Sequence, residues 1–139
     1  MRVLGVDYGD KRTGIAISDG LGLIANPVKT ITNANKTCLI NEIMQIIKEN
    51  SVEKVVVGKP LNMNGTEGER AHKTTQFAKE LEQKANISIE LIDERLTTVS
   101  AHNILNESNV NGSKKRKNII DTISAVIILQ QYLDKNRRI

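Results

Sequence analysis

The sequence predicts an α/β fold in which one mixed sheet of five strands carries helices on both of its faces. The N-terminal segment contains three strand-like stretches joined by short connections, which favours antiparallel neighbours. Segments with helical spacing then alternate with short apolar strands, as in parallel crossover units. No linker, internal repeat or low-complexity tract divides the chain, so we expect residues 1–139 to form a single domain.

The first three strands are expected at residues 2–7, 13–18 and 23–32. The first is an apolar run, and the second alternates isoleucine with small residues in the two-residue period of a strand. The third carries Pro27, which has no N–H to donate and therefore belongs at a sheet edge or a strand end. These three segments predict the antiparallel part of the sheet.

The middle of the chain predicts a helix, a strand and a second helix. Asn35 or Thr37 is expected to cap the first helix, and a valine run within 53–58 suits a strand covered on both faces. Thr66 and Glu69 match a capping box for the second helix. The expected buried faces are Leu39, Ile40, Ile43, Ile46 and Ile47 in the first helix, and Ala71, Thr74, Phe77, Ala78 and Leu81 in the second.

The last part of the chain predicts one more strand, a short helix and a long final helix. The strand is expected at 87–92, and Thr97 or Thr98 would cap the short helix. A polar loop would cover 107–117, and Asn118 would cap the final helix. The apolar residues of that helix are Ile119, Ile120, Ile123, Val126, Ile127, Leu129 and Leu133.

The composition narrows the range of functions. Hydrophobic residues make up 39% of the chain, enough for an aliphatic core, whereas aromatic residues make up 2%, too few for binding by rows of stacked rings. Cys38 is the single cysteine, which excludes an intramolecular disulfide and a multi-cysteine zinc site. The sequence contains no evident signal peptide or membrane-spanning run, so we expect a cytoplasmic protein with no membrane partner.

The charge favours an anionic partner such as nucleic acid. The net charge is +4, and four consecutive cations directly precede the predicted final helix, where they could grip phosphates. A solvated loop is the alternative for that run, and surface ion pairs are the alternative for the isolated arginines. The candidate nucleic-acid-binding residues are Lys11, Arg12, Arg70, Arg95, Lys114, Lys115, Arg116 and Lys117.

Four acids stand near the ends of predicted elements. Asp7 ends the first strand, Asp93 and Glu94 follow the last strand, and Asp121 lies in the first turn of the predicted final helix. Sites in open α/β sheets gather beyond the carboxyl ends of the strands. We therefore expect Asp7 and Glu94 to meet at one edge, where the final helix could bring Asp121 to them.

Carboxylates brought so close would repel each other, and their pKa values would rise. A divalent cation removes that cost, and hard oxygen ligands favour Mg²⁺ or Mn²⁺, which can activate water and neutralise the leaving oxygen of a phosphodiester. The sequence thus predicts Asp7, Glu94 and Asp121 as catalytic residues and metal ligands. The alternatives are a favourable helix-dipole contact for Asp121 and a simple strand end for Asp93 and Glu94, which we favour for Asp93.

Four segments resemble the YqgF family, also called RuvX. They are GVDYGDKRTGIA at 5–16 with Ser18 and Asp19, GKPLNMNG at 58–65, DERLTT at 93–98, and Asp121 with ILQQYL at 128–133. They span most of the chain in the family's order and spacing. Lys59 and Ser124 depart from the family pattern, which has an apolar residue and an alanine there.

The resemblance implies an RNase H-like fold with the metal-binding acids at Asp7, Glu94 and Asp121. It also implies a hydrolase that processes the 5′ end of the 16S ribosomal RNA precursor during ribosome biogenesis. Ribosomal precursor particles are then candidate partners. The family's relation to RuvC resolvases adds Holliday junctions and other branched DNA as an alternative substrate.

Three functions therefore compete: a metal-dependent nuclease, a non-catalytic RNA-binding factor of ribosome assembly, and a sugar kinase or actin-like ATPase. Metal-dependent cleavage would separate the first two. The third class duplicates this fold and binds ATP between the halves, and 139 residues do not supply a second half. A monomer and a homodimer are both compatible with the sequence.

Overall fold

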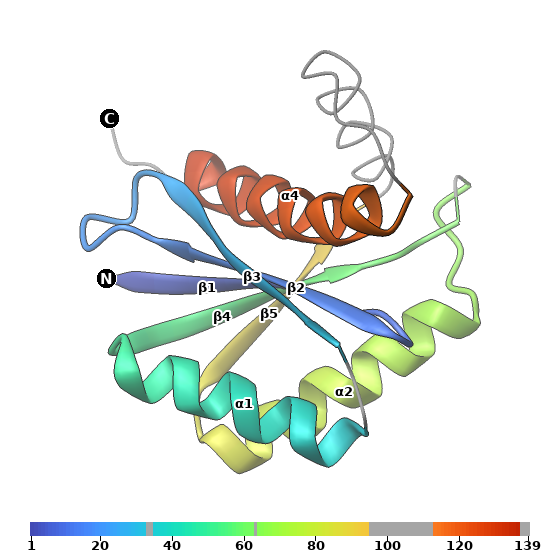
Figure 1. Cartoon of the computed structure of the whole chain (residues 1–139), viewed down its shortest axis with the longest axis horizontal. Helices are drawn as coiled ribbons and strands as arrows, with labels where there is room; N and C mark the ends of the chain where they lie inside the picture. The colour runs from blue at the N-terminus through green and yellow to red at the C-terminus, as the bar shows by residue number, and fades with distance from the viewer. Residues whose placement is uncertain (33–34, 63, 95–112, 137–139) are drawn as a thin grey trace.

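The computed structural model describes residues 1–32, 35–62, 64–94 and 113–136, with the backbone alone for 113–119. The elements within these ranges form three layers, with the sheet between α1 and α2 on one face and α4 on the other (Figure 1). The elements are β1 (Arg2–Asp7), β2 (Arg12–Ser18), β3 (Ala25–Thr32), α1 (Lys36–Glu49), β4 (Val52–Lys59), α2 (Glu69–Ala85), β5 (Ser88–Asp93) and α4 (Ser113–Lys135).

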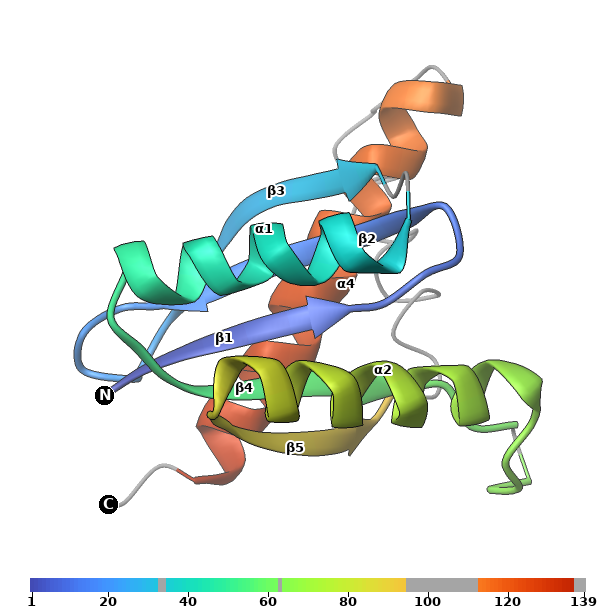
Figure 2. The same ribbon diagram turned by 90° about the horizontal axis from the view of Figure 1, so that it is seen from below.

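The sheet has five strands in the order β3-β2-β1-β4-β5. β1 pairs antiparallel with β2 and parallel with β4, so that Leu4 lies between Ile17 and Val55. β2 and β3 are antiparallel, and β4 and β5 are parallel. The mixed five-stranded sheet is therefore confirmed, and β3, which contains Pro27, lies at an edge as predicted (Figure 2).

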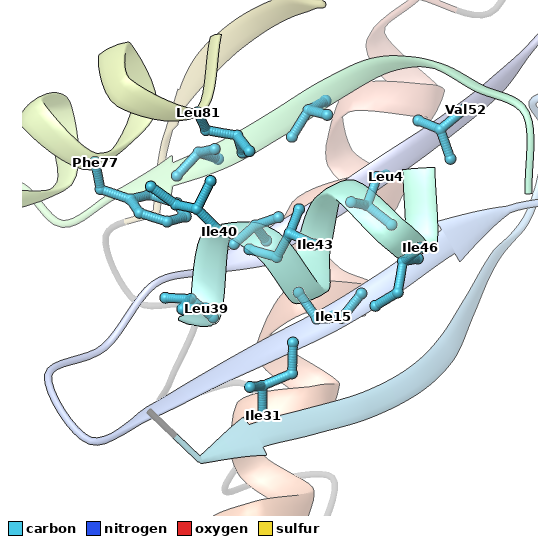
Figure 3. Packing of buried hydrophobic residues seen from close by; sticks show 13 residues of the cluster. Leu4, Ile15, Ile31, Leu39, Ile40, Ile43, Ile46, Val52, Phe77 and Leu81 are labelled. Atoms are coloured by element: carbon cyan, nitrogen blue, oxygen red, sulfur yellow. The ribbon is translucent and has the colours of Figure 1, made fainter. Parts of the chain in front are cut away.

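The larger apolar core lies between the sheet and the helices α1 and α2 (Figure 3). Asn35 caps α1 by accepting the Cys38 N–H at 2.8 Å, as one of the two predicted caps. All five residues predicted for the inner face of α2 are buried. The buried members of this core are Leu4, Val6, Ile15, Ile31, Leu39, Ile40, Ile43, Ile46, Val52, Val55, Val57, Phe77 and Leu81.

A second core lies between the sheet and α4. Its buried members are Val3, Ala16, Ala25, Val56, Ala125, Ile128, Leu129, Tyr132 and Leu133. A Cβ atom at Gly5 would lie 2.7 Å from the Cβ of Leu129, so this glycine lets α4 approach the centre of the sheet closely. The central strand β1 is consequently covered on both faces. No helix in the described ranges is both long and apolar enough to cross a membrane.

Two sequence predictions about helix starts are wrong. α4 begins at Ser113 rather than after Asn118, because the intervening lysines and arginine are good helix formers with no breaker among them. The predicted capping box of α2 does not form, since Thr66 donates instead to the Asn64 side chain at 2.6 Å and Gly68 is the N-cap. The short helix predicted after Thr97 or Thr98 lies outside the described residues.

Candidate functional site

Asp7 lies at the carboxyl end of the central strand. Its neighbours in the sheet are Gly14 of β2 beside it and, one residue earlier, the Val6–Val57 pair with β4. The next residue, Tyr8, stacks on Phe77 of α2 with ring centroids 4.2 Å apart, which ties the end of β1 to that helix. The backbone of Asp7 is thus fixed from two sides, and the residue as a whole is half-buried.

Glu94 follows β5 and reaches back across the end of β4. Its N–H donates to the carbonyl oxygen of Lys59 at 3.2 Å, which continues the parallel β4–β5 pairing by one residue. A Cβ atom at Gly58 would lie 2.6 Å from Glu94 Oε2, so the glycine leaves the space that the carboxyl group occupies. The parallel strands therefore bring Glu94 to Asp7, as the sequence predicted.

Asp121 comes from the opposite face of the sheet, on α4. Because the helix begins at Ser113, Asp121 lies more than two turns inside it, and the predicted position in the first turn is wrong. Helix and sheet meet closely here, since a Cβ atom at Gly14 would overlap the Asp121 carbonyl oxygen. The hydroxyl groups of Thr30 and Thr122 also share a hydrogen bond at 2.7 Å. A helix-dipole contact consequently does not account for an acid at Asp121.

Asp7 and Glu94 form a strongly coupled acid pair. Burial raises the pKa of Asp7 to about 6, and the charge of Asp121 adds to the rise. Burial, and secondly the charge of Asp7, raises the pKa of Glu94 to about 9. Near neutral pH the protonated Glu94 donates a hydrogen bond to the Asp7 carboxylate, so the two groups share one proton.

Arginines supply the positive charge beside the three acids. Burial raises the pKa of Asp121, but Arg12 opposes this rise, because its Nε donates to Asp121 Oδ2 at 2.8 Å. The charge of Arg70, in the first turn of α2, lowers the pKa values of all three acids. Burial nevertheless outweighs the effect of the two guanidinium groups, because the pKa values of all three acids stay raised.

The donor set fits a hard divalent cation, because it consists of the carboxylate oxygens of Asp7 in β1, Asp121 in α4 and Glu94 directly after β5. In the ranges that the structure describes, no three His, Cys, Asp or Glu side chains are already arranged as a metal-ligand group. Asp7 and Glu94 are hydrogen-bonded to each other, and Asp121 accepts a hydrogen bond from Arg12. The shared proton and the arginines hold the acids together in this state.

The residues predicted to contact phosphates differ in their exposure and in their partners. Lys11 is exposed in the β1–β2 turn, whereas Arg12 is engaged by Asp121. Arg70 is exposed and lines a small hollow with Tyr8 and Lys73. Arg95 lies outside the described residues. The run Lys114, Lys115, Arg116 and Lys117 lies in the first turns of α4 rather than in a loop, and its side chains are outside the description.

The residues that make room for the acids were not predicted from the sequence. Gly14 and Gly58 lie inside strands, each against the backbone or side chain of a predicted site residue. Glycine within a strand often marks the close approach of another segment, and this signal was present in the sequence. The Arg12–Asp121 pair carried no such signal, because its partners lie on separate elements far apart in the chain.

Residues 1–135 match the family described as RuvX: Holliday junction resolvase. A protein of Ruminiclostridium cellulolyticum is 47% identical over 136 residues, which cover 97% of this chain and 95% of the relative. One of Clostridium tetani is 48% identical over 134 residues, covering 96% of each chain. Both carry the name "Putative pre-16S rRNA nuclease".

Solved structures show the same fold at low identity. RuvC of Thermus thermophilus in complex with a Holliday junction substrate superposes with a TM-score of 0.61 at 10% identity, covering 97% of this chain and 94% of the other. The fowlpox virus Holliday junction resolvase gives 0.57 at 13% identity, covering 97% and 99%. The fold is therefore the RNase H-like fold of these resolvases, as predicted.

Proposed function

The chain belongs to the RuvX Holliday junction resolvase family, and from this premise we infer that it is a metal-dependent nuclease that hydrolyses phosphodiester bonds. We propose that Asp7, Glu94 and Asp121 are its catalytic residues and metal ligands. The proposal assigns the activity to one domain spanning residues 1–139, acting in the cytoplasm.

One observation carries this assignment: an acid pair with raised pKa values lies at the carboxyl ends of the parallel strands, beside a third acid from α4. An acid pair that only stabilised the fold would not need burial that raises both pKa values. Perturbed acids at the carboxyl edge of an α/β sheet are the usual sign of a functional centre.

Each residue then has a defined task. Asp7, Glu94 and Asp121 would hold Mg²⁺ or Mn²⁺, which supplies activation of the attacking water and neutralises charge on the leaving oxygen. Lys11 is exposed at the turn beyond Asp7, where it can contact a backbone phosphate. Arg70 faces the acids from α2 and can hold the phosphate that enters the centre. The four cations of the basic run extend the expected contact along α4.

The substrate follows from the relatives. Proteins 47% and 48% identical over nearly the whole chain are named for the 16S ribosomal RNA precursor, so we propose that this chain processes the 5′ end of that precursor. The family description and the RuvC complex name Holliday junctions, which makes branched DNA the second candidate substrate. Ribosomal precursor particles are the partners that the first substrate implies.

The test is to incubate the purified protein with labelled 16S precursor RNA and with a four-way DNA junction. Each substrate is offered with Mn²⁺, with Mg²⁺ and with EDTA. We expect cleavage that needs the metal, that acts on the precursor RNA and that is lost in Asp7→Asn. Glu53→Gln is the matched control, because it removes one carboxylate from an exposed position at the far end of β4.

The outcomes separate the competing functions. Cleavage of the junction but not of the RNA would assign the protein to branched DNA. Binding of RNA without cleavage under any metal condition would favour the non-catalytic assembly factor and contradict the proposal. Equal cleavage by wild type and Asp7→Asn would remove Asp7 from the centre.

A further inference from the structure

The ion pair between Arg12 and Asp121 joins two segments 109 residues apart at the edge of the acid cluster. Arg12 is the first residue of β2, and its Nε donates to Asp121 Oδ2 at 2.8 Å. The side chains are 33% and 22% exposed, so the pair is reachable from solvent on one side. From the sequence, Arg12 was predicted as a phosphate contact and Asp121 as a metal ligand, with no link between them.

Packing alone already fixes the backbone of Asp121. Gly14 lies directly against its carbonyl oxygen, and the Thr30–Thr122 hydrogen bond anchors the next residue to β3. The helix therefore does not need Arg12 in order to dock on the sheet. What the ion pair adds is a defined direction for the carboxylate, which would otherwise rotate about its side-chain bonds.

The guanidinium group can serve two acceptors at once. It is a planar fork with five N–H donors, and the contact with Asp121 uses its Nε. The two terminal NH₂ groups carry the remaining donors, and a third of the side chain is open to solvent. A phosphate of a bound strand could reach these donors beside Asp121. A lysine, with a single point of charge, could not hold both partners.

We propose that Arg12 is a positioning residue that connects the metal centre to the nucleic-acid backbone. Through Nε it orients the Asp121 carboxylate toward Asp7 and Glu94, and through its terminal NH₂ groups it holds a neighbouring phosphate. The inference rests on the proposed function, because it takes Asp121 as a metal ligand. It assigns Arg12 a role beyond the phosphate contact that the sequence alone predicts.

The first experiment measures Mn²⁺ binding without nucleic acid, from the spectroscopic signal of free Mn²⁺. The proteins are wild type, Arg12→Ala, Arg12→Lys and Arg2→Ala, the last removing one positive charge from the exposed far end of β1. We expect Arg12→Ala to lose about 10- to 100-fold in affinity, as for partners that orient metal ligands, and Arg2→Ala to stay near wild type. Either of two results in Arg12→Ala would overturn the proposal. Unchanged Mn²⁺ affinity would mean that Arg12 does not orient Asp121, and tighter binding would mean that Arg12 only repels the cation.

A double-mutant cycle shows whether Arg12 acts through Asp121. In the Asp121→Asn background, Arg12→Ala should cause no further loss of Mn²⁺ affinity. A loss as large as in the wild-type background would contradict the proposed route. A general structural effect of Arg12→Ala would persist in both backgrounds and would lower the thermal midpoint.

The phosphate contact is tested in EDTA by the salt dependence of duplex DNA binding. Arg12→Ala should lower the slope by about 0.9, the value of one lost phosphate contact, while Arg12→Lys keeps it. An unchanged slope in Arg12→Ala would remove the phosphate half of the proposal. If wild-type protein binds no Mn²⁺ and cleaves no substrate, both the proposed function and this inference are wrong. If wild type is active and Arg12→Ala has the same Mn²⁺ affinity and salt slope, only this inference is wrong.

Discussion

Replacing Asp7 by asparagine is expected to stabilise the metal-free protein while it abolishes cleavage. The substitution keeps the shape of the side chain but removes the charge that burial opposes. The pKa of Asp7 lies at about 6 instead of 3.8. This difference of roughly two units corresponds to at most about 3 kcal/mol of unfolding free energy.

The sign of the pH dependence follows from proton binding. Between the two pKa values the folded chain binds more protons at Asp7 than the unfolded chain, so wild-type stability falls as the pH rises through 6. Glu94, with a pKa of about 9 instead of 4.5, extends that fall to higher pH. Asp7→Asn removes the first contribution and weakens the second, because the Asp7 charge is one cause of the high pKa of Glu94.

The assay is urea unfolding in EDTA at pH 4, 6 and 8, followed on wild type, Asp7→Asn and the control Glu53→Gln. Wild type and Asp7→Asn should have nearly equal unfolding free energies at pH 4. At pH 8, Asp7→Asn should be more stable than wild type. On the same preparations, metal-dependent cleavage should fall by orders of magnitude in Asp7→Asn alone. Lower stability of Asp7→Asn than of wild type at pH 8, or a stability difference that does not vary with pH, would refute the conclusion that burial disfavours the charged form of Asp7.

Three further predictions concern the surroundings of the centre. Gly14→Ala should cost about 3 kcal/mol of unfolding free energy or more and abolish cleavage, since the added methyl overlaps the Asp121 carbonyl; urea unfolding checks this, and a near-neutral effect would contradict the close contact. Ser124→Ala should raise stability by about 1 kcal/mol, because the buried Oγ has no hydrogen-bond partner among the residues that the structure describes; an unchanged or lower thermal midpoint would argue against it. Replacing Lys114, Lys115, Arg116 and Lys117 by alanine should lower the salt slope of duplex binding by up to about 3.6, at roughly 0.9 per contact; an unchanged slope would show that these cations do not meet phosphates.

The sheet could be predicted from the sequence because its signals are local. Pro27 marked the edge strand, and the valine run of β4 marked a strand covered on both faces. The parallel order then placed Asp7 and Glu94 together, since strands that run the same way end at the same edge. Two of the three acids thus followed from topology alone.

The beginning of α4 could not be predicted as easily. Asn118 is a good cap by type, but the four preceding cations favour helix equally well, so the local signals conflict. Thr66 likewise has the spacing of a capping box, yet the Asn64 side chain competes for its hydroxyl group. In both places neighbouring polar or charged residues decide where the helix begins. The sequence pattern alone does not indicate which of the competing residues prevails.

The ion pair at the acid cluster could not be predicted from the sequence either. Arg12 and Asp121 are 109 residues apart in the chain, and only the docking of α4 on the sheet brings them together. The raised pKa values depend in the same way on burial that three separate elements create together. The residue types of the centre could be predicted, but not which charges neutralise one another.

The position of α4 on the far face of the sheet has a consequence for how the protein is made. Asp7 is synthesised before all the other elements that surround it, and Asp121, on the helix that covers β1, follows it by more than a hundred residues. A growing chain can pair its N-terminal hairpin early, but its acid cluster stays incomplete until the final helix has left the ribosome and docked. A chain that stops before α4 would therefore lack the third acid of the proposed centre.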